Sequence, residues 1–335
     1  MRIFRGTVSG FLLFALLALA GVSPTAAATP AWVKAPVVPA FGKQDRIKLK
    51  ARVTAGEKLG LRSGVFAKVG DSNTEFAPNF YGLACRQPVG LPADLRKTLV
   101  SYNRVRIRNP RSMPDCLPNT SFSRRSAAAQ AGVFTTWSLS RVGDLPDEGY
   151  WEKPSGCGMD TTPLDCEVSA IRPRYALVLL GTNDLGMDLY FELVPGRQTF
   201  ARMSAVVRRL LDRGVIPVLS TIPPVTKDDP VEQQKYAVGV ARTNAAIWKL
   251  SRIRRLPLVN LWRAMQAPAM IDLGLADDGV HFSVAGADGR MVGKEPEPST
   301  LTDSVNFTPG SLRYGANRHN LIWLKTLARL DRITG

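Results

Sequence analysis

Residues 64–74 read Gly-Val-Phe-Ala-Lys-Val-Gly-Asp-Ser-Asn-Thr, an apolar run that stops at Gly70 and is followed two residues later by a serine. A short apolar run that ends in Gly-Asp is the pattern of a strand followed by a turn. A serine at such a point can act as a nucleophile only if other parts of the chain supply a base, an acid that orients the base, and donors for an oxyanion. Ser72 is therefore the candidate nucleophile.

The rest of the chain alternates between apolar strand candidates and helical patterns. The clearest buried strand, Tyr-Ala-Leu-Val-Leu-Leu at 175–180, is followed by Gly181-Thr-Asn-Asp. Further strands are expected at about 121–126, 216–221 and 258–261, and helices at about 94–102, 133–139, 197–213, 231–254 and within 312–333. Apolar strands that alternate with helices indicate a parallel sheet with helices on both faces. The sequence thus predicts an α/β fold.

The N-terminal residues 1–28 are expected to be a signal peptide. Arg2 and Arg5 precede an apolar run at about 11–20, and Ala26-Ala-Ala follows. This is the layout of a cleaved secretory signal. A membrane-spanning helix would need about 20 apolar residues, and the run here is about half as long. We expect cleavage near residue 28, a secreted or periplasmic protein, and no stable insertion into a membrane.

The remaining chain is expected to hold one domain. Residues 29–60 are rich in proline and then in Lys and Arg, and we expect an extended lead-in. Residues 61–335 form the single domain, with loop insertions at about 75–120, 143–170 and 286–309. The last insertion is rich in Gly, Pro, Glu, Ser and Thr. It could be a lid over the site, and we favour a solvated loop.

The chain is strongly basic, with a formal net charge of +16. Loss of Arg2 and Arg5 with the signal peptide would lower this by two, to +14. Such charge favours anionic partners, for example an acidic polysaccharide or phospholipid head groups. The alternative, which we favour, is a basic surface that is scattered and has no such partner. The sequence has no zinc-finger spacing and no RNA-binding aromatic signature, so we do not expect nucleic acid as a partner.

Four cysteines, Cys85, Cys116, Cys157 and Cys166, lie after the predicted signal peptide. An even number in an oxidising compartment indicates disulfides. Of the three possible connectivities we favour Cys85–Cys116 and Cys157–Cys166, because each pair brackets a loop rich in Pro and Gly. The sequence has no Cys-x-x-Cys and only two histidines, so neither a metal nor another cofactor is expected.

The two histidines, His281 and His319, are the only candidates for a base that works near neutral pH. Asp278 precedes His281 by three residues, and on a helical turn residues three apart face each other. The Asp278 carboxylate could then hold the second ring nitrogen of His281. His319 has Arg318, Asn317 and Asn320 as neighbours and no such acid. We therefore expect His281 as the base and Asp278 as the orienting acid. The alternative is a loop histidine with an incidental aspartate nearby.

The expected oxyanion donors are the backbone N–H groups of Ser72 and Gly132 and the side-chain amide of Asn183. These residues follow strand candidates, and the carboxyl ends of parallel strands meet at one edge of a sheet. Asn183 could instead be a turn residue, and Gly132 could simply begin a helix. Asp71 is expected to order the turn or to cap the helix that follows.

Taken together, these motifs resemble those of the SGNH/GDSL-type hydrolases. Gly70-Asp-Ser72 resembles the first block of the family, Gly181-x-Asn-Asp184 the third, and Asp278-x-x-His281 the fifth, while Gly132 stands for the second. The resemblance covers about residues 64–283. It implies a flavodoxin-like three-layer fold and serine ester hydrolysis without a metal.

The sequence therefore predicts a secreted serine esterase that forms an acyl-enzyme on Ser72. Its substrate could be an acetylated polysaccharide, a lysophospholipid or a small acyl ester, and the positive charge favours an anionic polymer or lipid. Two alternatives stay open. The same triad could pass the acyl group to a sugar hydroxyl, or the chain could be a catalytically silent binding module on the cell surface.

Overall fold

The computed structural model describes residues 29–107, 119–147, 151–270, 273–295 and 297–335. The predicted signal peptide and Cys116, the predicted partner of Cys85, lie outside these ranges. Within them, no helix is both long enough and apolar enough to cross a membrane. Cys157 and Cys166 form a disulfide, which confirms that predicted pair.

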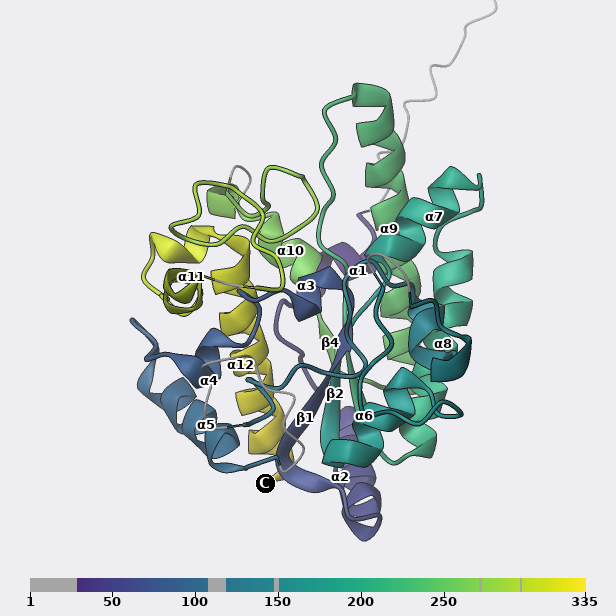
Figure 1. The fold of residues 1–335 in the computed structure, drawn as a ribbon, viewed down its shortest axis with the longest axis vertical. Helices are drawn as coiled ribbons and strands as arrows, with labels where there is room; N and C mark the ends of the chain where they lie inside the picture. Colours follow the sequence, from purple (N-terminus) through teal and green to yellow (C-terminus); the bar gives the residue numbers. More distant parts are fainter. Residues whose placement is uncertain (1–28, 108–118, 148–150, 271–272, 296) are drawn as a thin grey trace, which may run out of the picture.

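A four-stranded parallel sheet forms the centre of the molecule (Figure 1). Its strand order is β1-β2-β3-β4. The strands span β1 (Arg62–Gly70), β2 (Pro173–Leu179), β3 (Ile216–Ser220) and β4 (Leu258–Val259). β2 and β3 are buried along their whole length, as expected for strands that are covered on both faces. The predicted α/β fold is confirmed, and β4 is shorter than the sequence suggested.

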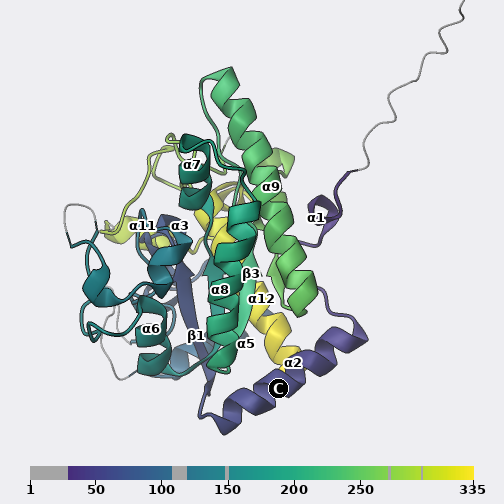
Figure 2. The ribbon, with the colours of Figure 1, turned by 90° about the vertical axis from the view of Figure 1, so that its right-hand side faces the viewer.

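Alternate side chains of the strands point into two separate hydrophobic cores. Phe66 packs in one core with α2, α5 and α12, whereas Val65 and Ala67 pack in the other with α6, α8 and α9. These helices span α2 (Lys43–Lys58), α5 (Ala93–Arg104), α6 (Pro163–Ile171), α8 (Arg197–Asp212), α9 (Pro230–Arg254) and α12 (Gly315–Thr334). Figure 2 shows α8 and α9 in front of the sheet. The result is the predicted three-layer arrangement.

The strand predicted at 121–126 does not form. Serine side chains take its place along the edge of β1: Ser121 Oγ accepts the N–H of Phe66 at 3.0 Å, and Ser126 Oγ donates to the carbonyl of Lys68 at 2.6 Å. Short hydroxyl side chains can satisfy a backbone edge in this way and so compete with a strand.

At the end of β1 a short segment pairs with the strand instead. Gly70 and Ala129 form an isolated parallel bridge. The Gly70 N–H donates to Ala128 and the Gln130 N–H donates to Gly70, both at 3.1 Å. If this short segment is counted as the second strand, the order becomes 2-1-3-4-5, which is the flavodoxin-like order.

The prediction of an extended segment at 29–60 is wrong. Residues 31–34 form α1 (Ala31–Lys34) and residues 43–58 form α2. In α2 the buried residues are Leu49, Val53 and Gly56, which lie four and three residues apart along one face of the helix. This narrow buried face is easily overlooked among the many Lys and Arg residues around it.

Short elements fill the loops above and beside the sheet. In place of the helix predicted at 133–139, the chain forms a 3-10 helix, η1 (Thr135–Leu139). A helix also lies within the predicted loop 286–309. The remaining elements are α3 (Ser72–Glu75), α4 (Gly82–Cys85), η2 (Val142–Asp144), α7 (Thr182–Tyr190), α10 (Leu261–Met265), η3 (Pro268–Met270), α11 (Pro298–Asp303) and η4 (Ser311–Arg313).

His319 lies in α12 and is fully buried. The indole N–H of Trp323 donates to His319 Nε2 at 2.9 Å, so the ring proton is on Nδ1, which lies 3.3 Å from Asn320 Oδ1. Burial lowers the pKa of His319 to about 3. This histidine is therefore a neutral core residue and not a base for Ser72.

The buried His319 makes stability depend on pH. The unfolded chain takes up a proton on this residue below about pH 6.5 and the folded chain does not, so acidification favours the unfolded state. From pH 6.5 to 4.5 we expect a cost of about 2–3 kcal/mol, because each pH unit corresponds to about 1.4 kcal/mol. Urea unfolding of the wild type and of His319→Gln at both pH values checks this. An equal pH dependence in the two proteins would contradict it.

Candidate active site

The single helical turn α3 follows β1 directly and begins with Ser72. Asp71 caps it, because its Oδ1 accepts the N–H of Asn73 at 3.0 Å, as the sequence predicted. A Cβ at Gly70 would lie 2.8 Å from the carbonyl of Leu179, so only glycine fits between β1 and β2 at this point. Ser72 is 7% exposed and lies at the carboxyl edge of the sheet.

The structure brings His281 and Asp278 to Ser72 across more than two hundred residues. His281 Nε2 lies 2.7 Å from Ser72 Oγ, and His281 Nδ1 is hydrogen-bonded to Asp278 Oδ2. The imidazole stacks on the ring of Phe76, with 4.7 Å between centroids. Ser72, His281 and Asp278 thus form a continuous chain of hydrogen bonds.

Asp278 reaches His281 through a tight turn and not through the helical turn that the spacing suggested. Its Oδ1 accepts the N–H groups of Val280 and His281, both at 3.0 Å. Gly279 has φ +69° and contacts the backbone of Thr226, so a side chain there would collide. Burial alone would raise the pKa of Asp278, but the hydrogen bonds from His281 and Val280 outweigh it and lower the pKa. The carboxylate is therefore held in its ionised form.

Asn73 holds the histidine segment in place, a role that the sequence gave no reason to expect. Its Nδ2 donates to the carbonyl of Val280 and its Oδ1 accepts the N–H of Phe282, both at 3.2 Å. The two peptide groups on either side of His281 are therefore tied to the residue that follows Ser72.

Gly132 and Asn183 lie together beside this arrangement. Asn183 is the second residue of α7, directly after β2, and its Nδ2 donates to the carbonyl of Val133 at 3.0 Å. Gly132 has φ +76°, a conformation that favours glycine. Both residues line a hollow of about 210 Å³ together with Val280, the neighbour of His281. Two of the residues expected to supply oxyanion donors therefore line one hollow, together with the residue that precedes His281.

Three buried or partly buried carboxylates hold the loop that carries Gly132. Glu75, the last residue of α3, accepts the N–H of Ala131 at 2.6 Å. Asp184 accepts both the N–H and the hydroxyl of Thr135 at 2.9 Å. Glu167 pairs with Arg124 and accepts the N–H of Ala127 at 2.9 Å. The sequence analysis assigned none of these roles, because acceptors from distant elements leave no spacing pattern.

Burial changes the acid strength of the carboxylates next to Ser72. It raises the pKa of Asp71 to about 7, and the nearby Asp184 adds to the effect. It also raises the pKa of Asp184 and Glu75. Asp71 Oδ2 is buried and has no hydrogen-bond partner among the described residues. Nowhere in the described part of the chain does a cluster of His, Cys, Asp and Glu form that could hold a metal ion.

Comparison with known proteins gives the class of the chain. Residues 124–288 match the model of the GDSL-like Lipase/Acylhydrolase family. This range contains Gly132, Asn183, Asp278 and His281 and begins after Ser72. No curated protein matches the chain in this comparison.

The fold also has distant likenesses among solved structures. A lipase/acylhydrolase from Enterococcus faecalis is 17% identical, with 65% of this chain and 86% of that chain covered and a TM-score of 0.40. A carbohydrate esterase family 3 protein from Talaromyces cellulolyticus is 15% identical, with 77% and 97% covered and a TM-score of 0.41. An acetyl xylan esterase from Geobacillus stearothermophilus is 14% identical, with 66% and 88% covered and a TM-score of 0.40.

Residues 124–288 therefore belong to a GDSL-like lipase/acylhydrolase domain. This match assigns an ester-bond hydrolase domain to residues 124–288.

Glu75 should control activity through the position of the Gly132 loop. We expect Glu75→Ala to lower kcat for p-nitrophenyl acetate by about 10- to 100-fold with little change in KM, since an oxyanion donor acts mainly in the transition state. Glu75→Gln keeps an oxygen acceptor for Ala131 and should stay within about threefold of wild type. Steady-state kinetics and thermal melting of both variants check this. Equal losses in the two variants would show that the charge, and not the hydrogen bond, matters.

Proposed function

We propose that the chain is a secreted serine esterase in which Ser72, His281 and Asp278 form the catalytic triad. The observation that carries the proposal is the 2.7 Å hydrogen bond between His281 Nε2 and Ser72 Oγ. Because Asp278 is bonded to Nδ1, the proton of the neutral ring is on Nδ1 and Nε2 is free to accept one. The serine hydroxyl thus has a base in contact with it and the base has an orienting carboxylate.

In the first half-reaction, Ser72 Oγ attacks the carbonyl carbon of the ester while its proton moves to His281 Nε2. The ionised Asp278 stabilises the imidazolium that forms. When the tetrahedral intermediate collapses, His281 gives the proton to the departing alcohol oxygen, and the acyl group remains on Ser72.

The negative charge of the intermediate needs donors that are already oriented. We propose the N–H groups of Ser72 and Gly132 and the side-chain amide of Asn183 for this role. Asn183 Nδ2 has two hydrogens and donates one to the carbonyl of Val133, so the other can be donated to the oxyanion. In the second half-reaction water takes the place of the alcohol, and the same residues release the acid.

We also propose that the protein is exported. The signal-peptide pattern at residues 1–28 supports this, and the Cys157–Cys166 disulfide is compatible with an oxidising compartment. The candidate substrates remain an acetylated polysaccharide, a lysophospholipid or a small acyl ester. Mass spectrometry of the mature protein tests export, because removal of about the first 28 residues is expected.

Substitution of the triad tests the mechanism. We expect Ser72→Ala and His281→Ala to lower kcat for p-nitrophenyl acetate by roughly 10³-fold or more, and Asp278→Asn to cause a loss of similar order. A fluorophosphonate probe should label the wild type and Ser140→Ala, a control outside the site, but not Ser72→Ala. A wild-type protein that takes no label and turns over no ester would exclude the esterase and leave the binding-module alternative.

The acyltransferase alternative is tested in the same assay. A hydrolase should form no acetylated sugar when a free sugar is added, since water is its acceptor. Acetate release and acetylated sugar are measured together by chromatography. A fall in acetate release that is matched by acetylated sugar would assign the enzyme to acyl transfer.

A further inference from the structure

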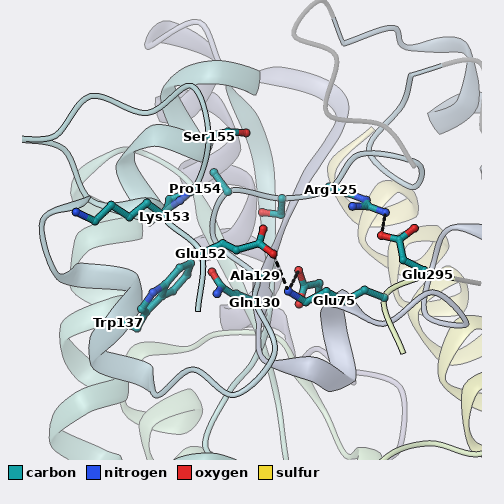
Figure 3. A pocket seen from close by; sticks show the side chains of 13 residues that line it. Glu75, Arg125, Ala129, Gln130, Trp137, Glu152, Lys153, Pro154, Ser155 and Glu295 are labelled. Atoms are coloured by element: carbon teal, nitrogen blue, oxygen red, sulfur yellow. Dashed lines mark hydrogen bonds and ion pairs between the residues drawn. The ribbon is translucent and has the colours of Figure 1, made fainter. Parts of the chain in front are cut away.

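A second hollow, of about 340 Å³, is lined in part by residues that precede Gly132 in the same loop (Figure 3). Its wall includes Glu75, three residues after Ser72, and Ala129 and Gln130, which pair with Gly70 at the end of β1. The hollow is therefore built on the residues that position the proposed nucleophile. The proposed mechanism gives it no role.

Two residues that line this hollow, Gln130 and Glu152, are hydrogen-bonded to each other. In the orientation that satisfies its amide, Gln130 donates to the carbonyl of Glu152 and accepts the N–H of Glu152, both at 2.7 Å. Since the Gln130 backbone N–H also donates to Gly70, a hydrogen-bonded path runs from β1 to Glu152. The position of Glu152 is thereby set relative to Ser72.

The hollow is polar, and its charges are balanced. Among the described residues that line it are three carboxylates and three cations: Glu75, Glu152, Glu295, Arg125, Lys153 and Lys294. Arg125 pairs with Glu295 at 2.7 Å, and Lys294 Nζ lies between Glu75 and Glu152 at 3.7 and 3.9 Å. The strong positive charge of the whole chain is not concentrated here, so the hollow gives an anion no advantage.

The two hollows differ in polarity, and the acyl and alcohol halves of an ester can differ in the same way. The 210 Å³ hollow beside Asn183 is lined by apolar side chains such as Phe134, Met187 and Val225 and suits an acyl group. The 340 Å³ hollow offers carboxylate oxygens, which accept hydrogen bonds from hydroxyl groups, beside the apolar surfaces of Trp137 and Pro154. That combination matches a ring with several hydroxyl groups.

We propose that the hollow between Glu75 and Glu152 binds the alcohol half of the ester, and that this half is an uncharged, hydroxyl-rich group such as a neutral sugar. The inference rests on the proposed function and deepens it. It also differs from the anionic substrate that the net charge suggested. Glu152 is the residue that should recognise the sugar, because its side chain is 79% exposed and the backbone beneath it is held by Gln130.

The test uses the full mature protein and three acetyl esters: p-nitrophenyl acetate, a monoacetylated methyl glucoside, and the corresponding methyl glucuronide. The glucoside should be the better sugar substrate by kcat/KM. Glu152→Gln should lower kcat/KM for the glucoside about tenfold, since the hydrogen bond to a charged acceptor becomes a weaker one to a neutral amide oxygen, and should change that for p-nitrophenyl acetate less than about twofold. Asp94→Asn on α5 removes the same charge outside the hollow and should change neither.

A second variant tests the space itself. Ser155→Trp adds a large side chain to an exposed position in the wall and should abolish turnover of the glucoside ester while p-nitrophenyl acetate is still hydrolysed. If the glucuronide is hydrolysed as fast as the glucoside, or if both variants leave sugar-ester turnover unchanged, the assignment of the hollow is wrong. If the wild type does not hydrolyse p-nitrophenyl acetate, the esterase proposal fails and this inference fails with it.

Discussion

The site depends on the single helical turn α3, because its residues contact both the histidine segment and the loop that carries Gly132. Ser72 meets His281, Asn73 binds the peptide groups on either side of that histidine, and Glu75 binds the loop that carries Gly132. A four-residue helix has little stability of its own, so it depends on the Asp71 cap and on the close approach of β1 and β2 at Gly70. The proposed nucleophile, base and oxyanion loop are therefore all held by this one short helix.

Buried carboxylates hold the part of the site that has no regular secondary structure. The segment 119–134 pairs with β1 at Gly70 but forms no regular strand, so others of its backbone N–H groups need acceptors from elsewhere, and an unsatisfied buried group is costly. Glu167 meets this need from α6 while its charge is paired with Arg124, both side chains being at most 2% exposed. Removing one partner of such a pair costs about 3–5 kcal/mol. The loop geometry that the proposed oxyanion donors require is thus linked to the stability of the fold.

The sequence contained enough information to predict the sheet and the residues that meet at its edge. The apolar runs of β1, β2 and β3 are continuous, and Asp278 precedes His281 by a spacing that a turn can close. The predicted strand at 121–126 was wrong because serine hydroxyls bond to the edge of β1, which a pattern of residue types does not reveal. Glu75 and Asn73 were missed because each bonds to the backbone of a distant segment. Side chains that act on a backbone partner leave no motif.

We propose that Ser72, Gly132 and Asn183 surround one oxyanion. A crystal structure of the protein after reaction with a small alkyl fluorophosphonate tests this most directly. We expect phosphorus bonded to Ser72 Oγ, with the phosphoryl oxygen about 2.7–3.1 Å from the N–H nitrogens of Ser72 and Gly132 and from Asn183 Nδ2. An adduct on another residue, or a phosphoryl oxygen that points away from Gly132 and Asn183, would contradict it.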